Sequence, residues 1–486
     1  MKLVAKGLGI FLYLVTLNLS TADELSQGPF RLNYLELERE EIRRSPDLRD
    51  WVPEDDLVHF IFEAVQRLPL EDFQVNHRGS GNRQFPPPHM MLALLIYCYA
   101  NRLFSSRKIE QATHRDVAVR FLTGNTHPDH DTICKFRREN FDAFNNAFVS
   151  VLELAQELKL LKLGDVAIDG THIKANASID QNVTYERALE IRDQLQLDVA
   201  ELLEQAETAD KNDEDHQKLP KEIARREELI SKMDQAVEEL KQRATVRDAK
   251  AQADYEEKLK ERQRKEEETG KKPGGRTPKQ PKTGPENSDV QANLTDPDAR
   301  IMRKNKRAGF TESYNAQAAV DADGSQLIVG EHVSQSASDS TELENGINSI
   351  PEEIGKSKAG LLDAGYVDGD AIERVEESGI ELFVSVHRED AHSERNYDYR
   401  PKKQSERPIK AVKDSRLLKM REKLRSEEGK ARYAKRNHTV ETAFGIIKEV
   451  MGFRGFMLRG LEKVKGEWTL VCLSYNLKRL HRLKAS

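Results

Sequence analysis

The chain has 486 residues, of which 37% are hydrophobic and 33% charged, and it carries a net charge of −6. This length corresponds to about three domains and excludes peptide hormones, toxins and single-fold modules. The mean hydropathy is −0.71, and no apolar run approaches the ~18 residues of a membrane span, which excludes an integral membrane protein. Three scattered cysteines without CxxC spacing (Cys98, Cys134 and Cys472) encode neither a disulfide framework nor a zinc site and indicate a reducing compartment.

Positive charge is concentrated in the last fifth of the chain. Residues 401–486 contain 23 Lys and Arg against 9 Asp and Glu, a net charge of +14, so the remaining residues carry −20. A region of this kind fits a polyanionic partner. A solvated, lysine-rich surface is the alternative that charge alone leaves open.

The first 22 residues have the features of a secretory signal. Lys2 and Lys6 precede an apolar stretch over residues 9–19, and small residues follow at 20–22. Nothing farther along the chain is typical of a secreted protein. We interpret residues 1–30 as an atypical extension, with two origins left open: a genuine leader, or translation from an upstream start.

Residues 31–160 are predicted to form an all-α domain. Apolar residues fall at helical spacing over 57–65, and residues 90–99 are apolar enough for a buried helix. A helix closed by Gly124 is followed by a second, basic helix that Asp129 or Asp131 can cap. The pair resembles a helix-turn-helix. A plain helical bundle with a charged outer face is the alternative.

The pattern then changes to strands, interrupted by a long helical segment. An apolar run at 166–168 predicts a buried strand, and residues 171–177 a second one. Between 185 and 270 apolar residues recur every seven positions, as at Ile223, Ile230 and Val237, which predicts a helical hairpin or coiled-coil arm. Residues 271–295 lack any apolar period and are predicted to be a linker.

Strands and helices alternate in the remainder of the chain. The turn at 321–324 predicts a hairpin between strands 314–320 and 326–333, and apolar segments at 359–362 and 381–386 predict two more strands. Helices are expected between these strands and beyond residue 440. The fold class is therefore predicted to be α/β, with one long helical insertion.

Three acidic residues stand out from this pattern. Asp169 and Asp363 each follow an apolar strand and precede a small residue, at the position where α/β sheets bind ligands. The ordinary role of such an aspartate is turn or helix capping. Glu441 lies seven residues before Lys448, which places both on one face of a helix. Three converging carboxylates bind two hard divalent cations through oxygen, and Mg²⁺ is the natural choice.

Several short motifs occur around these residues. They are Asp-Gly-Thr-His-Ile-Lys-Ala-Asn at 169–176, Asp-Ala-Gly-Tyr at 363–366, Tyr433-x2-Arg436-x4-Glu441-x6-Lys448, and flanking segments at 104–110, 127–133, 452–454 and 459–462. In this order they closely resemble the motifs of bacterial insertion-sequence transposases of the DDE type. The resemblance covers roughly residues 30–486.

The resemblance implies an architecture and an activity. It implies a ribonuclease H-like catalytic domain that performs metal-dependent DNA strand cleavage and strand transfer, preceded by a helical DNA-binding domain. The corresponding boundaries are an extension at 1–30, the helical domain at 31–160, the first part of the catalytic domain at 161–184, the coiled-coil insertion and linker at 185–295, and the remaining catalytic part with basic C-terminal helices at 296–486. A catalytically inactive DNA-binding or structural derivative is the alternative.

The resemblance also assigns roles to residues and partners. Asp169, Asp363 and Glu441 are expected to be catalytic and to hold two Mg²⁺ or Mn²⁺ ions. The expected DNA-binding residues are Lys448, Arg436, Lys174, Arg107, Lys108, Lys135, Arg137 and Arg138. Expected partners are the terminal inverted repeats of the element, target DNA and further copies of the chain, without stable membrane association. Because chromosomal DNA would be the substrate, we expect a cytoplasmic protein.

Two departures from the family pattern affect these roles. His172 stands where the family often has lysine, so a phosphate contact from this position would be weaker and dependent on pH. Four residues instead of three separate Arg436 from Glu441, which on a continuous helix turns Arg436 100° away. Arg436 therefore shares the site only if the helix begins after it, for which Asn437 is a plausible N-cap.

Overall fold

The computed structural model describes residues 48–69, 72–73, 88–212, 219–270, 274–303, 307–386 and 414–484. The chain divides into two compact units, Met1–Trp51 and Val52–Ser486. In the first unit, the 3₁₀ helix Leu48–Trp51 is described, and the predicted extension at 1–30 lies outside the described residues. Within the described ranges, no helix is both long and apolar enough to cross a membrane.

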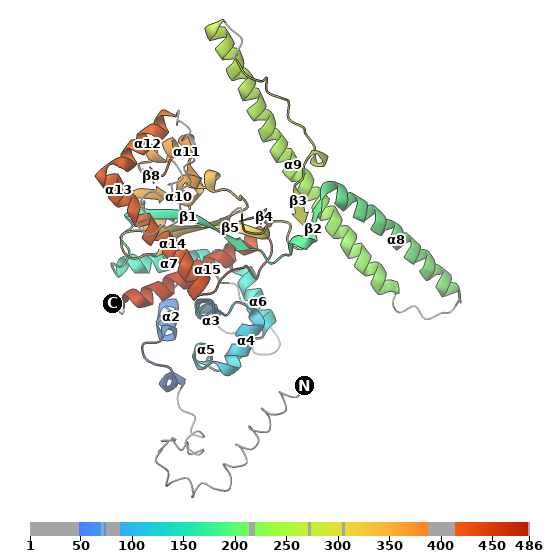
Figure 1. Cartoon of the computed structure of the whole chain (residues 1–486). Coiled ribbons are helices and arrows are strands. Elements are labelled where there is room, and N and C mark those ends of the chain that lie inside the picture. The colour runs from blue at the N-terminus through green and yellow to red at the C-terminus, as the bar shows by residue number, and fades with distance from the viewer. Residues whose placement is uncertain are drawn as a thin grey trace, which may run out of the picture. The chain divides into compact units, whose positions relative to one another are not determined.

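The second unit begins with a set of helices, as the sequence predicts (Figure 1). They are α2 (Leu57–Val65), α3 (Pro88–Ala100), α4 (Ser106–Arg115), α5 (Val117–Leu122), α6 (His130–Glu139) and α7 (Phe141–Glu157). Helix α3 is apolar on all sides and buries every residue from 91 to 100, as expected of a central helix. Asp129 accepts a hydrogen bond from the Thr132 amide at 2.7 Å, which confirms the predicted cap of α6.

A mixed six-stranded sheet forms the centre of the unit. Its strands are β1 (Asp165–Lys174), β4 (Arg300–Met302), β5 (Thr311–Asp321), β6 (Ile328–Ser334), β7 (Ala359–Leu362) and β8 (Glu381–Val384). Strand β1 pairs antiparallel with β5 and parallel with β7, and β8 continues parallel to β7. The predicted hairpin is β5–β6. The predicted separate strand at 171–177 is wrong, because β1 continues through Gly170 to Lys174 in unbroken register with β5.

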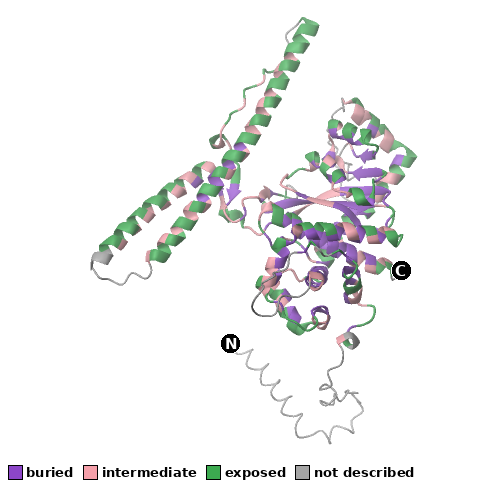
Figure 2. Ribbon diagram, turned by 180° about the vertical axis from the view of Figure 1, so that it is seen from behind, coloured by how far each residue is buried: buried purple, intermediate pink, exposed green. Residues whose placement is uncertain are grey.

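Helices on both sides of the sheet complete the core. Helix α15 (Leu461–Lys484) lies below the strands in Figure 1 and contacts α3, α7 and β6, whereas α10 (Leu343–Asn348) and α11 (Gly369–Glu377) lie above them. Most of α15 is buried, and Figure 2 shows buried residues in the strands and in the helices packed against them. The α2–α7 helices and the sheet therefore share one hydrophobic core.

The chain after the sheet's last strand carries part of the candidate site. From residue 414 it forms α12 (Ser415–Arg425), α13 (Glu427–Ala434), a 3₁₀ turn at Lys435–His438, α14 (Val440–Gly445) and a π-helical turn at Ile446–Val450. Arg432 and Lys435 bind Asp165 at the start of β1, and both also pair with a second carboxylate. These ion pairs fix the segment before α14 against the sheet.

The predicted helical hairpin is present. Helices α8 (Tyr185–Asn212) and α9 (Leu219–Thr269) run antiparallel, as shown by ion pairs from Arg192 to Asp234 (3.7 Å) and from Arg226 to Asp198 (3.9 Å). The buried side of α9 includes Met233, Val237 and Leu240 of the predicted seams. Strands β2 (Asn182–Thr184) and β3 (Gln291–Asn293) pair at the base of this arm, so the predicted linker at 271–295 is structured near its end.

Candidate active site

The two aspartates lie on neighbouring strands of the sheet. The parallel register of β1 and β7 pairs Ala167 with Leu361, and two residues farther along each strand come Asp169 and Asp363. Asp169 lies inside β1 instead of at its end, but it is just past the last residue of β1 that pairs with β7. The sheet itself therefore brings together two carboxylates that are far apart in the sequence.

Asp363 combines its ordinary structural role with a place in the site. Its Oδ1 accepts a hydrogen bond from the Gly365 amide at 2.7 Å and caps the 3₁₀ turn Ala364–Tyr366. Its Oδ2 lies 3.8 Å from Nη2 of Arg436. The capping bond holds one oxygen and leaves the other directed toward the site.

Glu441 reaches the same place from the first turn of α14. A break at Thr439 separates this helix from the 3₁₀ turn that carries Arg436. The helix therefore begins after Arg436, as the four-residue spacing requires if Arg436 is to share the site. The residue before the helix is Thr439, so the predicted N-cap Asn437 is wrong. Nη1 of Arg436 lies 4.0 Å from Oε1 of Glu441.

Arg436 lies between the three carboxylates. Its Nη2 donates to Oδ2 of Asp169 at 2.8 Å, and the same guanidinium faces Asp363 and Glu441. The Arg436 side chain is 9% exposed, whereas those of Asp169, Asp363 and Glu441 are 19%, 41% and 60% exposed. Arg436 therefore shares the site with the three carboxylates, and its expected contact with a DNA phosphate stays a prediction.

Burial controls the charge of Asp169. Desolvation raises the pKa of this carboxyl to about 7, the Arg436 guanidinium opposes the rise, and the charges of Asp363 and Asp339 add to it. Burial also lowers the pKa of His172, so this imidazole is neutral at neutral pH. Asp169 therefore depends on nearby positive charge to stay ionised.

Lys448 contacts the strand that carries Asp169. Its Nζ donates to Oγ1 of Thr171 and to the His172 carbonyl, the latter at 3.3 Å. Lys448 lies in the π-helical turn, so the predicted geometry of a regular α-helix from Glu441 to Lys448 is wrong. The π turn widens the helix, a feature common at functional sites, and Lys448 still reaches the edge of the site.

Most of the other predicted DNA-binding residues face solvent. Lys174 is exposed at the end of β1, and Arg107, Lys108 and Arg138 are exposed on α4 and α6, two helices in mutual contact. Lys135 is partly exposed and lies 3.9 Å from Glu139. Lys174 lies on the same strand as Asp169, whereas Arg107, Lys108, Lys135 and Arg138 lie on the α4 and α6 helices of the N-terminal part.

Arg137 has a structural role, which corrects its assignment to DNA binding. It is 3% exposed and donates to the Tyr99 hydroxyl at 2.7 Å and to the Phe104 carbonyl at 2.8 Å. The Tyr99 hydroxyl donates to Oε1 of the fully buried Glu467 at 2.7 Å, and that oxygen is 3.8 Å from Arg137. This buried group joins α3, α6 and α15.

We expect Arg137→Ala to destabilise the protein by about 3–5 kcal/mol, because it leaves the Glu467 carboxylate buried without its counter-ion. The neighbouring exposed Arg138 is the matched control, and Arg138→Ala should change stability by no more than about 0.5 kcal/mol. Chemical denaturation of the two variants measures both effects. Equal stability of Arg137→Ala and the wild type would contradict the structural role.

The sequence analysis missed a polar group next to the aspartates. Asn315 and Gln317 lie two residues apart on β5, and both donate to Oδ1 of Asp339, at 2.8 and 2.7 Å. The Tyr366 hydroxyl donates to Oε1 of Gln317. The available signal was the period-two placement of Asn315 and Gln317 among the apolar residues of the segment 314–320.

The three carboxylates fit divalent cations. Among the described residues, no three His, Cys, Asp or Glu side chains lie close enough together to hold a metal ion. The guanidinium of Arg436 supplies the positive charge here, and oxygens of Asp169, Asp363 and Glu441 lie within 4.0 Å of it. Carboxylate oxygens are the donors that Mg²⁺ and Mn²⁺ prefer. A metal ion held by these carboxylates would have to displace Arg436 from Asp169.

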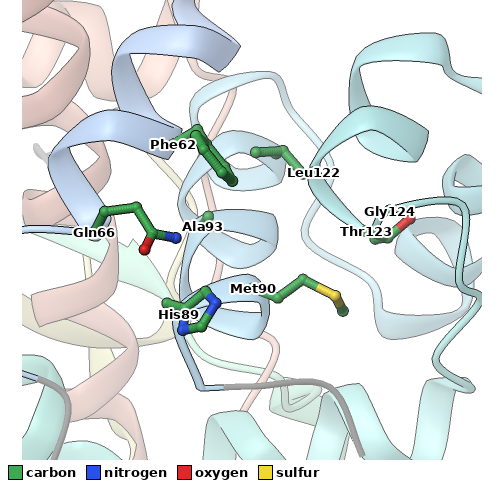
Figure 3. A pocket seen from close by; sticks show the side chains of 8 residues that line it. All are labelled: Phe62, Gln66, His89, Met90, Ala93, Leu122, Thr123 and Gly124. Atoms are coloured by element: carbon green, nitrogen blue, oxygen red, sulfur yellow. The ribbon is translucent and has the colours of Figure 1, made fainter. Parts of the chain in front are cut away.

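A hollow of about 190 Å³ occurs elsewhere, among α2, α3 and the end of α5 (Figure 3). Its lining consists of Phe62, Gln66, His89, Met90, Ala93, Leu122, Thr123 and Gly124. The lining contains no acidic residue, so it does not fit a divalent cation or chemistry at a phosphate.

Two segments of the chain match known protein families. Residues 46–139, which include α2–α6, match a family described as Transposase domain (DUF772). Residues 395–481, which include Arg436, Glu441 and Lys448, match a family described as Transposase DDE domain. Comparison with curated proteins and with solved structures gave no match.

Proposed function

This chain is a transposase with a DUF772 N-terminal domain and a DDE catalytic domain, and we propose that it catalyses cleavage and transfer of the DNA strands of an insertion sequence. The observation that carries the proposal is the convergence of Asp169, Asp363 and Glu441 on one cationic group. These residues come from a strand, a strand end and a helix in three separate parts of the chain.

The proposed chemistry is displacement at phosphorus by a water and then by a DNA 3′-hydroxyl. Asp169, Asp363 and Glu441 would hold two divalent cations, which would supply Lewis-acid activation of the attacking oxygen and neutralise charge on the leaving 3′ oxygen. Lys448, whose Nζ donates to the Thr171 hydroxyl, is proposed to bind a DNA phosphate near Asp169. Asp169 takes part only when ionised, which the cations favour.

The proposed catalytic domain is ribonuclease H-like. Support comes from the mixed sheet, in which the central strand β1 and its parallel neighbour β7 supply the two aspartates and α14 adds the glutamate. The proposed DNA contacts are Lys448 and Lys174 on the catalytic domain, and Arg107, Lys108, Lys135 and Arg138 on the helical domain. We infer that the protein acts in the cytoplasm, where its DNA substrate is found, and as an oligomer on DNA.

The test uses the full-length protein and labelled duplexes that carry the ends of the element. We expect Mg²⁺- or Mn²⁺-dependent nicking at the end of the element, followed by joining of the free 3′ end to target DNA. A duplex of scrambled sequence is the control for specificity. Binding of the ends without cleavage under any divalent cation would favour the alternative, a catalytically inactive DNA-binding derivative.

The α8–α9 arm is proposed to serve binding and not chemistry. Its contacts at the base involve a small hydrophobic cluster around Met233 and Val237, apart from the carboxylates. Exposed apolar residues lie farther along α8, at Leu197 and Leu203. The arm therefore offers a surface for DNA or for a second copy of the chain.

Shortening the arm beyond the Asp198–Arg226 ion pair tests this role. Replacing residues 201–223 with a short flexible linker keeps the cluster at the base, so we expect unchanged thermal stability of the core but weaker DNA-end binding or self-association. Electrophoretic mobility shift and light scattering measure the two properties. If both stay at the wild-type level, the part of the arm formed by residues 201–223 has no such role.

A further inference from the structure

We propose that Asp339 is a fourth acidic residue of the site, a positioning residue that adds negative charge beside Asp169 and Asp363 and so strengthens the binding of divalent cations. This inference rests on the proposed function, since it concerns the cations that the transposase reaction requires. Asp339 begins the 3₁₀ turn Asp339–Thr341, just after β6.

Contacts place Asp339 against the motifs of both aspartates. A Cβ atom built on Gly170, the residue after Asp169, would lie 2.5 Å from Oδ1 of Asp339. A Cβ atom built on Gly365, two residues after Asp363, would lie 3.6 Å from Oδ2 of Asp339. Both glycines thus allow close approach of Asp339, and a larger residue at 170 would displace it.

Hydrogen bonds fix the orientation of this carboxylate. Oδ1 accepts from the side-chain amides of Asn315 and Gln317, which are 1% and 0% exposed. Gln317 in turn accepts from Tyr366, in the turn that Asp363 caps. Among the described residues, Oδ2 of Asp339 accepts no hydrogen bond. One oxygen is therefore anchored, and the charge of the other is directed toward the Asp363 turn.

A second, independent observation points to a bound ligand here. Oδ1 of the buried Asn315 has no hydrogen-bond partner within the part of the chain that the structure describes. It lies 2.8 Å from the same Cβ position on Gly170. A buried acceptor without a donor is costly, and a water molecule or a hydrated cation supplies the missing donor.

Charge also favours this role. Arg436 is one cation among Asp169, Asp363 and Glu441, and the negative charge of Asp339 also acts on Asp169. Burial lowers the pKa of the neighbouring His172, and the charge of Asp339 opposes this shift. The excess negative charge at the site favours two divalent cations over one guanidinium.

Titration of the full-length protein with Mn²⁺ in the absence of DNA tests the proposal by calorimetry and electron paramagnetic resonance. Asp339→Asn keeps an oxygen that accepts from Asn315 and Gln317 but removes the charge. We expect it to retain the wild-type melting temperature and to bind Mn²⁺ about tenfold more weakly, the size typical of a residue behind the metal ligands. Glu344→Gln, a surface carboxylate paired with Arg374, is the control and should bind Mn²⁺ normally.

Asp169→Asn and Asp363→Asn separate this inference from the proposed function. If these two variants bind Mn²⁺ weakly and Asp339→Asn binds it within twofold of the wild type, the role of Asp339 is overturned and the proposed site stands. If all three variants bind Mn²⁺ like the wild type, the proposed cation site itself is wrong, and the inference about Asp339 is overturned with it.

Discussion

Asp169→Asn, Asp363→Asn and Glu441→Gln should each reduce DNA strand cleavage by roughly 10³-fold or more, which corresponds to about 4 kcal/mol of transition-state stabilisation. Each substitution keeps the size of the side chain and removes one anionic oxygen donor from a site whose three carboxylates face the same guanidinium. Cleavage of labelled element ends measures the loss. Binding of the same DNA should persist, because phosphate contacts from basic residues supply most of it.

The controls separate loss of chemistry from loss of fold. Glu462 also lies in the first turn of a helix, pairs with Lys465 and is 78% exposed, so Glu462→Gln should cleave DNA like the wild type. Asp169→Asn should fold normally, because burial already raises the pKa of Asp169 to about 7 and favours a neutral side chain at this position. Wild-type cleavage by any of the three active-site variants would exclude that residue from the site.

Arg436→Ala should destabilise the metal-free protein by about 1.5–3 kcal/mol, because Asp169 loses its charged hydrogen-bond partner and must take up a proton beside two other carboxylates. Divalent cations should then restore much of the stability, since they take the place of the guanidinium. We expect Mn²⁺ to raise the melting temperature of Arg436→Ala by more than that of the wild type. Thermal unfolding with EDTA and with saturating Mn²⁺ gives the comparison.

Arg432 provides a matched control for this experiment. It lies four residues earlier and pairs with Asp165 and Glu381, outside the three-carboxylate group. Arg432→Ala should lower the melting temperature by a similar amount with and without Mn²⁺. If Arg436→Ala behaves in the same way, Arg436 does not compete with metal and only supports the fold.

The sequence alone predicted most of the helices and strands and the three candidate carboxylates, but not the unbroken strand β1 or the π turn that carries Lys448. A period of seven predicted the helical arm, and the structure buries Met233, Val237 and Leu240 of its seams. The turn after residue 320 predicted the β5–β6 hairpin. These features were readable because burial of a strand or helix face imposes a repeat on nearby residues. The order of the motifs around Asp169, Asp363 and Glu441 also indicated the transposase family. Two segments of the chain match transposase domain families, which supports this indication.

Only the tertiary structure decided what the charged side chains do. Arg137 and Arg138 are neighbours in one basic helix, yet Arg137 is buried against Glu467, whereas Arg138 is exposed. Arg436 belongs to the basic C-terminal region, but it lies among the carboxylates instead of on the surface. The partners of such side chains are hundreds of residues away in the sequence, so a local sequence pattern does not predict them. The role of a charge follows from the segment packed opposite it, which only the folded chain specifies.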